Sequence, residues 1–129
     1  MRALTAKFAA IAVAVTGLVV AVAQPASAND YVGSYNFIGE HSEGTGYWYD
    51  GSDTLCARAN PDVSGNLRVT LVPANGVGAS YSVVDGRSAG RTCTGNLSIP
   101  EDKKYRMKFT RYHTSGSTHV GYGAGYLYS

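Results

Sequence analysis

The sequence predicts an all-β protein, a small antiparallel β-sandwich or barrel of about seven or eight short strands. Residues 66–72 and 105–111 alternate apolar and polar side chains with a period of two, the pattern of a strand with one buried face. Turn pairs such as Asn75-Gly76 and Asp85-Gly86 follow strand-like runs and favour the tight turns of hairpins. After residue 28, no stretch of ten residues keeps the apolar spacing of a helix.

The two clearest strands each place their apolar side chains on one face. Leu67, Val69 and Leu71 would point into the core from the first strand, since alternate residues of a strand share a face. Met107 and Phe109 would do so from the second. Weaker β-like runs occupy much of the remaining chain, at 31–38, 45–49, 54–59, 79–85, 91–99 and 118–128. Together these runs predict a single β domain spanning 29–129.

The N-terminus has the three zones of a secretory signal peptide. Arg2 and Lys7 give a positive start, residues 8–23 form an uncharged apolar segment, and 26–28 read Ala-Ser-Ala, a small-x-small cleavage site. A membrane anchor is the alternative, but the apolar run is short for the roughly 20 residues that span a bilayer. We predict a cleaved signal peptide at 1–28 and a secreted, extracellular domain.

Removal of the signal changes the charge balance. The whole chain has 11 Lys+Arg and 9 Asp+Glu, and Arg2 and Lys7 both belong to the signal. The remaining domain has nine residues of each sign, which argues against nucleic acid or a membrane as a partner, since both attract surplus basic residues. Binding should then depend only weakly on salt. Strong salt dependence would instead indicate the basic face of Arg106 and Lys108.

The cysteines predict one disulfide. Cys56 and Cys93 are the only two in the chain, and a pair in a small exported domain most simply forms a bridge. Neither has a further Cys or His at the spacing of metal ligands. The bridge would join either the two sheets or two non-sequential neighbours in one sheet.

Residues 39–44 contain side chains that a hydrolase would need. Glu40, His41 and Glu43 lie close together in the sequence, but adjacent positions of an extended chain face opposite sides, so Glu40 and His41 would not converge. We interpret the segment as a solvated loop and assign no catalytic residue.

His113 and His119 flank residues 114–118 and would lie opposite each other across a hairpin. Two histidines make a poor zinc site, since a catalytic zinc takes three protein ligands. His41 is the candidate for a third, and the simpler interpretation is two exposed histidines beside a loop. No metal and no cofactor are therefore expected.

The candidate ligand-binding residues are aromatic. Tyr47, Trp48 and Tyr49 are consecutive, so either the Trp ring or the two Tyr rings face the core. Tyr122, Tyr126 and Tyr128 share one face of the last run, with glycines on the other, where a second sheet can approach closely. These tyrosines form either a core stripe or an exposed platform for sugar or protein.

Residues 53–60, Asp-Thr-Leu-Cys-Ala-Arg-Ala-Asn, resemble a segment of small secreted antifungal and killer-toxin-like proteins of streptomycetes. The likeness covers these eight residues and implies a crystallin-type β fold. The Ala- and Val-rich signal and the composition are similar to those of exported proteins of Gram-positive actinobacteria.

We therefore expect a small secreted, non-enzymatic binding protein of an actinobacterial organism, with an extracellular protein or polysaccharide as ligand and an inhibitory or toxin-like role included. Aromatic and glycine-rich strands support binding, and the sequence has no His-Glu-x-x-His motif. One alternative is a small hydrolase, ribonuclease-like in size and composition. It would use His41, His113 or His119 together with Glu40 or Glu43. The other is a Tyr/Gly-rich structural protein of the cell surface.

Overall fold

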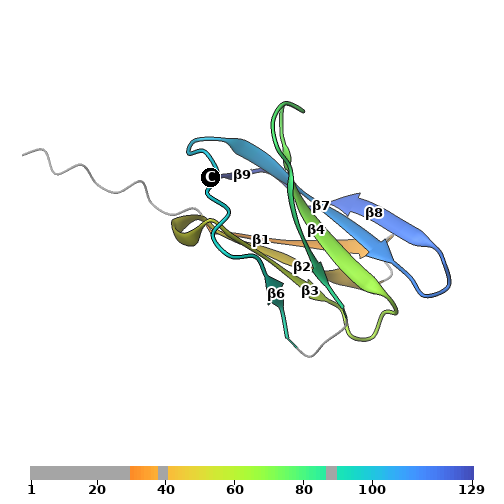
Figure 1. Cartoon of the computed structure of the whole chain (residues 1–129). Coiled ribbons are helices and arrows are strands. Elements are labelled where there is room, and N and C mark those ends of the chain that lie inside the picture. Colours follow the sequence, from red (N-terminus) through yellow and green to blue (C-terminus); the bar gives the residue numbers. More distant parts are fainter. Residues whose placement is uncertain (1–29, 38–40, 87–89) are drawn as a thin grey trace, which may run out of the picture.

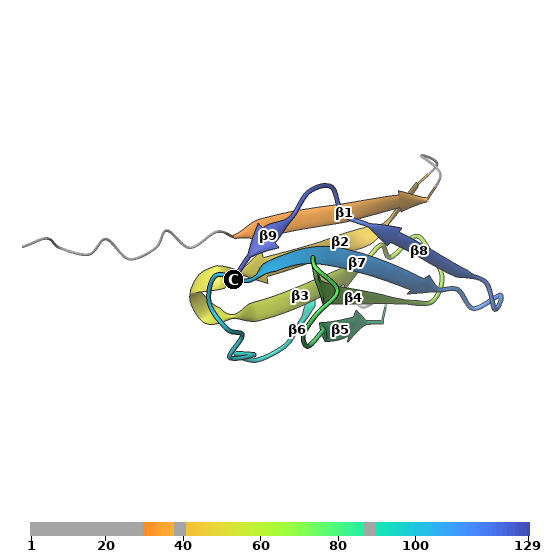
Figure 2. The same cartoon turned by 90° about the horizontal axis from the view of Figure 1, so that it is seen from above.

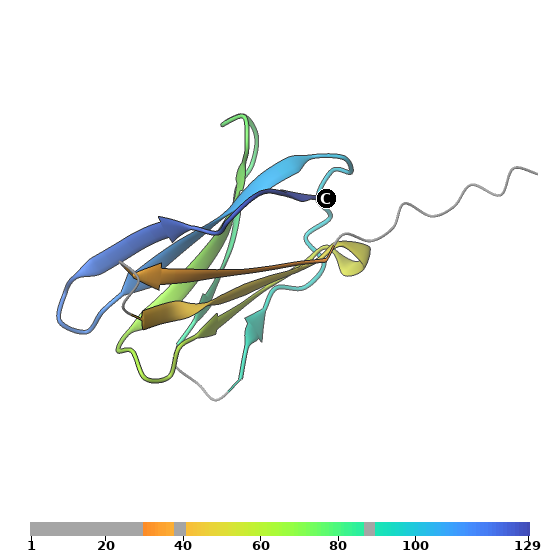
Figure 3. The same cartoon turned by 180° about the vertical axis from the view of Figure 1, so that it is seen from behind.

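The fold is a two-layer β-sandwich. The structure, a computed structural model, describes residues 30–37, 41–86 and 90–129. These residues form nine strands in two antiparallel sheets that face each other (Figure 1, Figure 3). The all-β prediction is confirmed, and the one helical element described is a 3-10 turn, η1 (Asp50–Ser52). No described helix is long and apolar enough to cross a bilayer, and the predicted signal at 1–28 lies outside the described residues.

The four-stranded sheet contains, in spatial order, β1 (Tyr31–Phe37), β2 (His41–Tyr49), β3 (Thr54–Ala59) and β6 (Thr92–Cys93). The first three strands form a meander, and β6 joins its edge from far along the chain. Cys56 and Cys93 lie directly opposite each other in the β3–β6 pair and form the disulfide. The predicted bridge is confirmed, and it connects neighbouring strands of one sheet.

The five-stranded sheet has β7 (Lys104–Tyr112) near its centre. On one side of it lies β4 (Asn66–Pro73), followed by the edge strand β5 (Tyr81–Asp85). On the other side lie β8 (Thr118–Tyr122) and β9 (Leu127–Tyr128), which pair with different parts of β7 (Figure 2). The alternating runs that the sequence predicts at 66–72 and 105–111 are thus the two central strands of this sheet.

In two of the weaker runs the strand ends well before the predicted end. In the run 91–99 only β6 is a strand. Thr94 N–H still donates to the Leu55 carbonyl at 2.8 Å, but Leu55 N–H donates to Thr94 Oγ1 at 3.0 Å, and Ser98 N–H donates to Asn96 Oδ1 at 2.7 Å. The run 118–128 is divided into β8 and β9 by a turn in which Gly125 has a φ of 78°. The physical cause in both cases is local turn chemistry that competes with strand pairing.

The core is filled mainly from the five-stranded sheet. Its fully buried apolar side chains are Leu67, Val69, Leu71, Met107 and Phe109, all at 0% exposure. Of the ten tyrosines, all within the described residues, Tyr105 alone is fully buried, and its ring meets that of Tyr81 edge-on at 6.3 Å. Burial raises the pKa of Tyr105, and the neighbouring Tyr81 adds to the rise.

Glycines of β2 let the second sheet approach closely. A Cβ atom on Gly46 would lie 2.4 Å from Sδ of Met107 and 2.8 Å from Cγ1 of Val69, and one on Gly44 would lie 2.4 Å from Cδ2 of Leu67. The large side chains of the five-stranded sheet therefore pack directly on the backbone of β2. This close packing explains how a chain with few aliphatic residues still forms a dense core.

Gly121 gives a test of the same close packing on the opposite sheet. A Cβ atom there would lie 2.0 Å from Cε2 of Tyr35, whose ring stacks on Phe109 at 6.4 Å. We expect Gly121→Ala to lower the free energy of unfolding by about 1–3 kcal/mol, the range typical of overpacking, as measured by urea denaturation.

Gly95→Ala is the matched control for this change, because a Cβ atom at Gly95 meets nothing within 4 Å. In a background that already carries Tyr35→Ala, the Gly121→Ala change should cost much less. An undiminished cost in that background would show that the ring of Tyr35 is not the cause.

Candidate functional site

The structure divides the six aromatic candidates among three places. Trp48 is at 0% exposure in the core, so its assignment to a ligand-binding surface is corrected. The cause is the alternation along β2, which turns Trp48 inward beside Leu55 of β3 and turns the two flanking tyrosines outward. Of the two orientations that the sequence allowed, the structure has the one with an internal Trp.

Tyr47 and Tyr49 form a small half-buried cluster on the outer face of the four-stranded sheet. Their rings are nearly parallel, at 5° and 6.5 Å between centroids. The Arg91 guanidinium lies 4.6 Å from the centroid of Tyr47 and hydrogen-bonds the hydroxyl of Tyr49. Both tyrosine side chains are only partly exposed, so this cluster offers less free aromatic surface than exposed rings would.

Tyr122, Tyr126 and Tyr128 are exposed, at 45%, 49% and 48%. Gly121 and Gly123 pack inward, against Tyr35 and Phe109, so these three tyrosine rings are exposed and do not form a core stripe. Each ring has a cation from β7 above it. Arg106 lies 4.3 Å from the centroid of Tyr122, and Lys104 lies 4.2 Å from that of Tyr126 and 5.9 Å from that of Tyr128.

These residues belong to a continuous outer surface of the five-stranded sheet. The pairing registers place Lys108 beside Tyr122 and Arg68 beside Thr110 on the same side, and Arg68 lies over the exposed ring of Tyr112 at 5.4 Å. Among the strands that the structure describes, no outward position of this sheet carries an acidic side chain. We call this surface the cationic tyrosine face; its members are Arg68, Lys104, Arg106, Lys108, Tyr112, Tyr122, Tyr126 and Tyr128.

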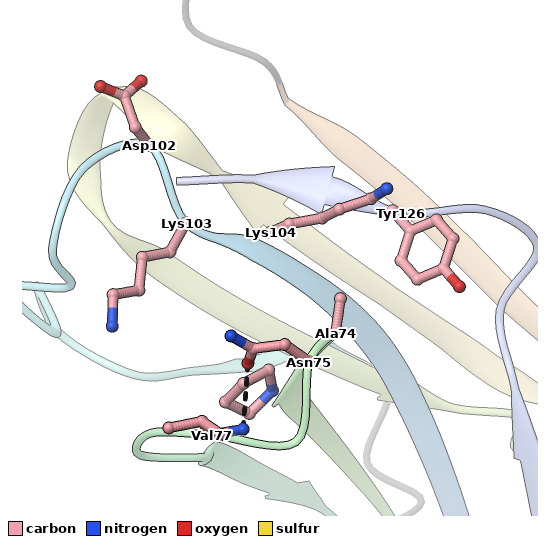
Figure 4. Close-up of a pocket in the computed structure, with 8 residues that line it drawn as sticks. Ala74, Asn75, Val77, Asp102, Lys103, Lys104 and Tyr126 are labelled. Atoms are coloured by element: carbon pink, nitrogen blue, oxygen red, sulfur yellow. Dashed lines mark hydrogen bonds between the residues drawn. The ribbon is translucent and has the colours of Figure 1, made fainter.

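A pocket of about 500 Å³ lies where this face ends, at the start of β7. Asp102, Lys103, Lys104 and Tyr126 line one side, and the turn after β4 lines the other, so two cations and one carboxylate border the pocket (Figure 4). That turn is held by the Val77 N–H, which donates to Asn75 Oδ1 at 2.9 Å. The pocket therefore continues the cation and tyrosine chemistry of the face into a concave site.

A second cluster lies at the other end of the sandwich, around Glu43. The solvated-loop interpretation of 39–44 is wrong for the described residues 41–44, which begin β2. Tyr35 pairs with Gly44 and Asn36 with Ser42, so Glu43 is the inserted residue of a β-bulge. A bulge re-aims a side chain, and Glu43 is turned inward, at 0% exposure. Glu40 and the side chain of His41 lie outside the described part.

The bulge brings Glu43 to the two histidines of the β7–β8 hairpin. Oε1 of Glu43 lies 2.6 Å from Nδ1 of His119 and 3.5 Å from Nε2 of His113, and these two nitrogens are 2.9 Å apart. The histidine side chains are 10% and 18% exposed, so they are largely covered rather than solvated. The predicted apposition of His113 and His119 is present, and Glu43 is the third member of the cluster.

Arg111 supports the cluster from beneath. Its side chain is fully buried, and its Nε lies 3.9 Å from Oε2 of Glu43. The guanidinium also donates to backbone carbonyl oxygens of the loop between β3 and β4 and of β2, which belong to Glu43, Asn60, Val63 and Ser64. Arg111 thereby fixes both the carboxylate and the loop beside it.

The sequence does not predict that Glu43 and Arg111 belong to this cluster, or that Arg68 and Tyr112 belong to the cationic tyrosine face. The alternation at 105–111 does place Arg106 and Lys108 outward, which was the available signal for the face. No comparable signal marks Glu43, because the bulge depends on the register with β1.

Comparisons with known proteins give no assignment. No protein-family model matches the chain, and searches of the curated proteins and of the solved structures find no match. Function is therefore inferred from the side chains themselves.

Proposed function

We propose that this protein is a secreted, non-enzymatic binding domain that holds an anionic polysaccharide on its cationic tyrosine face. The observation that carries the proposal is the arrangement of exposed tyrosines beneath cations, with Arg106 over Tyr122 at 4.3 Å and Lys104 over Tyr126 at 4.2 Å. Tyrosine supplies contact area at low conformational cost, and cations over the rings keep both groups in place.

The chemistry of the face fits a sugar polymer with carboxylate, sulfate or phosphate groups. Ring faces offer apolar area for the C–H faces of sugars, and the tyrosine hydroxyls offer hydrogen bonds. The four cations lie on two paired strands of one sheet: Arg68 is on β4, and Lys104, Arg106 and Lys108 are on successive outward positions of β7. A broad sheet surface suits an extended chain, and the pocket at the end of the face suits one terminal or branching unit.

The cationic tyrosine face changes the salt dependence expected from the sequence. A net charge of zero describes the whole domain, whereas this face has one sign of charge along its strands. Binding through it should weaken as salt screens the cations. The alternative in which Arg106 and Lys108 attract the ligand is therefore the one that we adopt.

The test compares dextran sulfate with dextran, which share a backbone and differ in charge. We expect capture of dextran sulfate and of polygalacturonate, but not of dextran. Arg106→Gln and Tyr122→Ala should each raise Kd by about 30-fold, which corresponds to a hot-spot loss of about 2 kcal/mol. Titration calorimetry at low and high salt measures both effects, with Tm measured in parallel.

Tyr47→Ala and Arg58→Gln on the four-stranded sheet are the matched controls, and neither should change Kd. Equal capture of the charged and uncharged dextrans, or capture that falls in Tyr47→Ala and not in Tyr122→Ala, would refute the proposal. Binding to a protein in place of every polysaccharide would refute the ligand class.

A further inference from the structure

We infer that Glu43, His113 and His119 form a binding site for a divalent transition-metal ion of the zinc type. The site lies at the opposite end of the five-stranded sheet from the pocket, and it is independent of the proposed polysaccharide face. One carboxylate oxygen and two imidazole nitrogens converge there, all within 4.8 Å of one another.

The distances allow one ion to reach all three atoms. The separations of 2.6 Å, 2.9 Å and 3.5 Å among Oε1, Nδ1 and Nε2 place them on a small circle. Its radius is less than the roughly 2.0–2.1 Å of a zinc–nitrogen or zinc–oxygen bond. An ion slightly to one side of their plane can therefore bind all three, with the two shorter separations widening by a few tenths of an ångström around it.

Hydrogen bonding and metal binding would use the same three atoms. Nδ1 of His119 makes close contacts with both Glu43 and His113, and a ring nitrogen carries either one proton or one lone pair. With a proton on Nδ1, one three-centre hydrogen bond serves both the carboxylate and a neutral His113. A bound cation would displace that proton and be held by all three atoms at once.

The donor set selects the kind of metal. Two imidazoles and one carboxylate suit zinc and related borderline ions, whereas magnesium and calcium prefer oxygen ligands. Three protein ligands leave a further position for water. His113 also lines a shallow pocket together with Asn60, Asp62, Val63 and Ser64, through which solvent can reach the site.

The fold holds the three ligands in place before any ion binds. Two backbone hydrogen bonds fix the hairpin: His113 N–H donates to the Ser117 carbonyl at 2.9 Å, and Gly116 N–H donates to that of His113 at 3.0 Å. The Arg111 guanidinium lies on the Oε2 side of Glu43, which leaves Oε1 directed at the histidines. Because Glu43 and the histidines belong to different sheets, a bound ion would join the two layers.

The experiment titrates metal-free protein with Zn²⁺ and with Co²⁺. We expect one ion bound per chain, a visible Co²⁺ absorption of four- or five-coordinate type, and a Tm that rises by about 10 °C or more at Zn²⁺ near 100 times Kd. His119→Ala and His113→Ala should each weaken Zn²⁺ binding at least tenfold and abolish the Co²⁺ absorption. Thr118→Ala, next to His119 and exposed, is the matched control and should bind normally.

Glu43→Gln, a change of nearly equal volume, should also weaken Zn²⁺ binding. If that variant does not fold, the two histidine variants, whose side chains are partly exposed, still decide the question. Zn²⁺ binding that fails to saturate below about 1 mM, or that is equal in wild type and both histidine variants, would overturn the site.

Discussion

The variant Arg111→Met is expected to lose about 3–5 kcal/mol of its free energy of unfolding, as is typical when one partner of a buried ion pair is removed. The Arg111 side chain is fully buried and donates to backbone carbonyl oxygens at 2.8 Å in β2 and at 3.1 Å in the loop between β3 and β4. Met fills a similar volume but donates no hydrogen bond. The carbonyls and the Glu43 carboxylate would remain buried without these donors, which costs more than the lost bonds themselves.

Arg106→Met is the control, since it makes the same chemical change on the same strand at an exposed position. It should alter stability by no more than about 0.5 kcal/mol. Urea denaturation monitored by Trp48 fluorescence measures both variants. Equal losses in the two would show that the buried network around Arg111 contributes no special stability.

Loss of the disulfide is expected to lower the free energy of unfolding by about 2–4 kcal/mol and Tm by more than about 10 °C. Cys56 and Cys93 are separated by 37 positions, so the bridge removes much freedom from the unfolded chain. It also anchors β6, whose two residues have only two paired positions with β3. Calorimetry with and without reductant measures the change.

The double variant Cys56→Ala/Cys93→Ala should match the reduced protein and should not respond to reductant. Cys93 is exposed at the sheet edge, so reductant can reach the bridge without unfolding of the domain. A reduced protein with unchanged Tm, or two free thiols in the oxidised protein by mass spectrometry, would contradict this prediction.

The sequence predicts strands well where one face of the strand is buried and the other is exposed to solvent. The predicted run 54–59 coincides with β3, and 66–72 and 105–111 match β4 and β7 to within one residue at either end. In these strands the alternation of apolar and polar residues corresponds directly to the alternation of buried and exposed side chains. The run 91–99 carries a weaker pattern, and there the side chains of Thr94 and Asn96 bond to the backbone instead.

The sites depend on information that a single strand does not contain. Glu43 is internal because β1 and β2 differ by one residue in length across the bulge, and alternation within β2 alone would place Glu43 and Gly44 on opposite sides. The cationic tyrosine face combines Arg68 with residues of β7 and the C-terminal strands, whose proximity follows from sheet order. Residue types suggested the chemistry, and pairing determined which residues meet.

The glycines that β2 presents to the interior also bear on how the chain folds. At Gly44 and Gly46 the meander β1–β3 has no side chain of its own to bury, and the space is filled by Leu67, Val69 and Met107 of the other sheet. A meander formed alone would leave this backbone facing water. We therefore expect the two layers to assemble together in one cooperative transition that depends on contacts between distant parts of the chain.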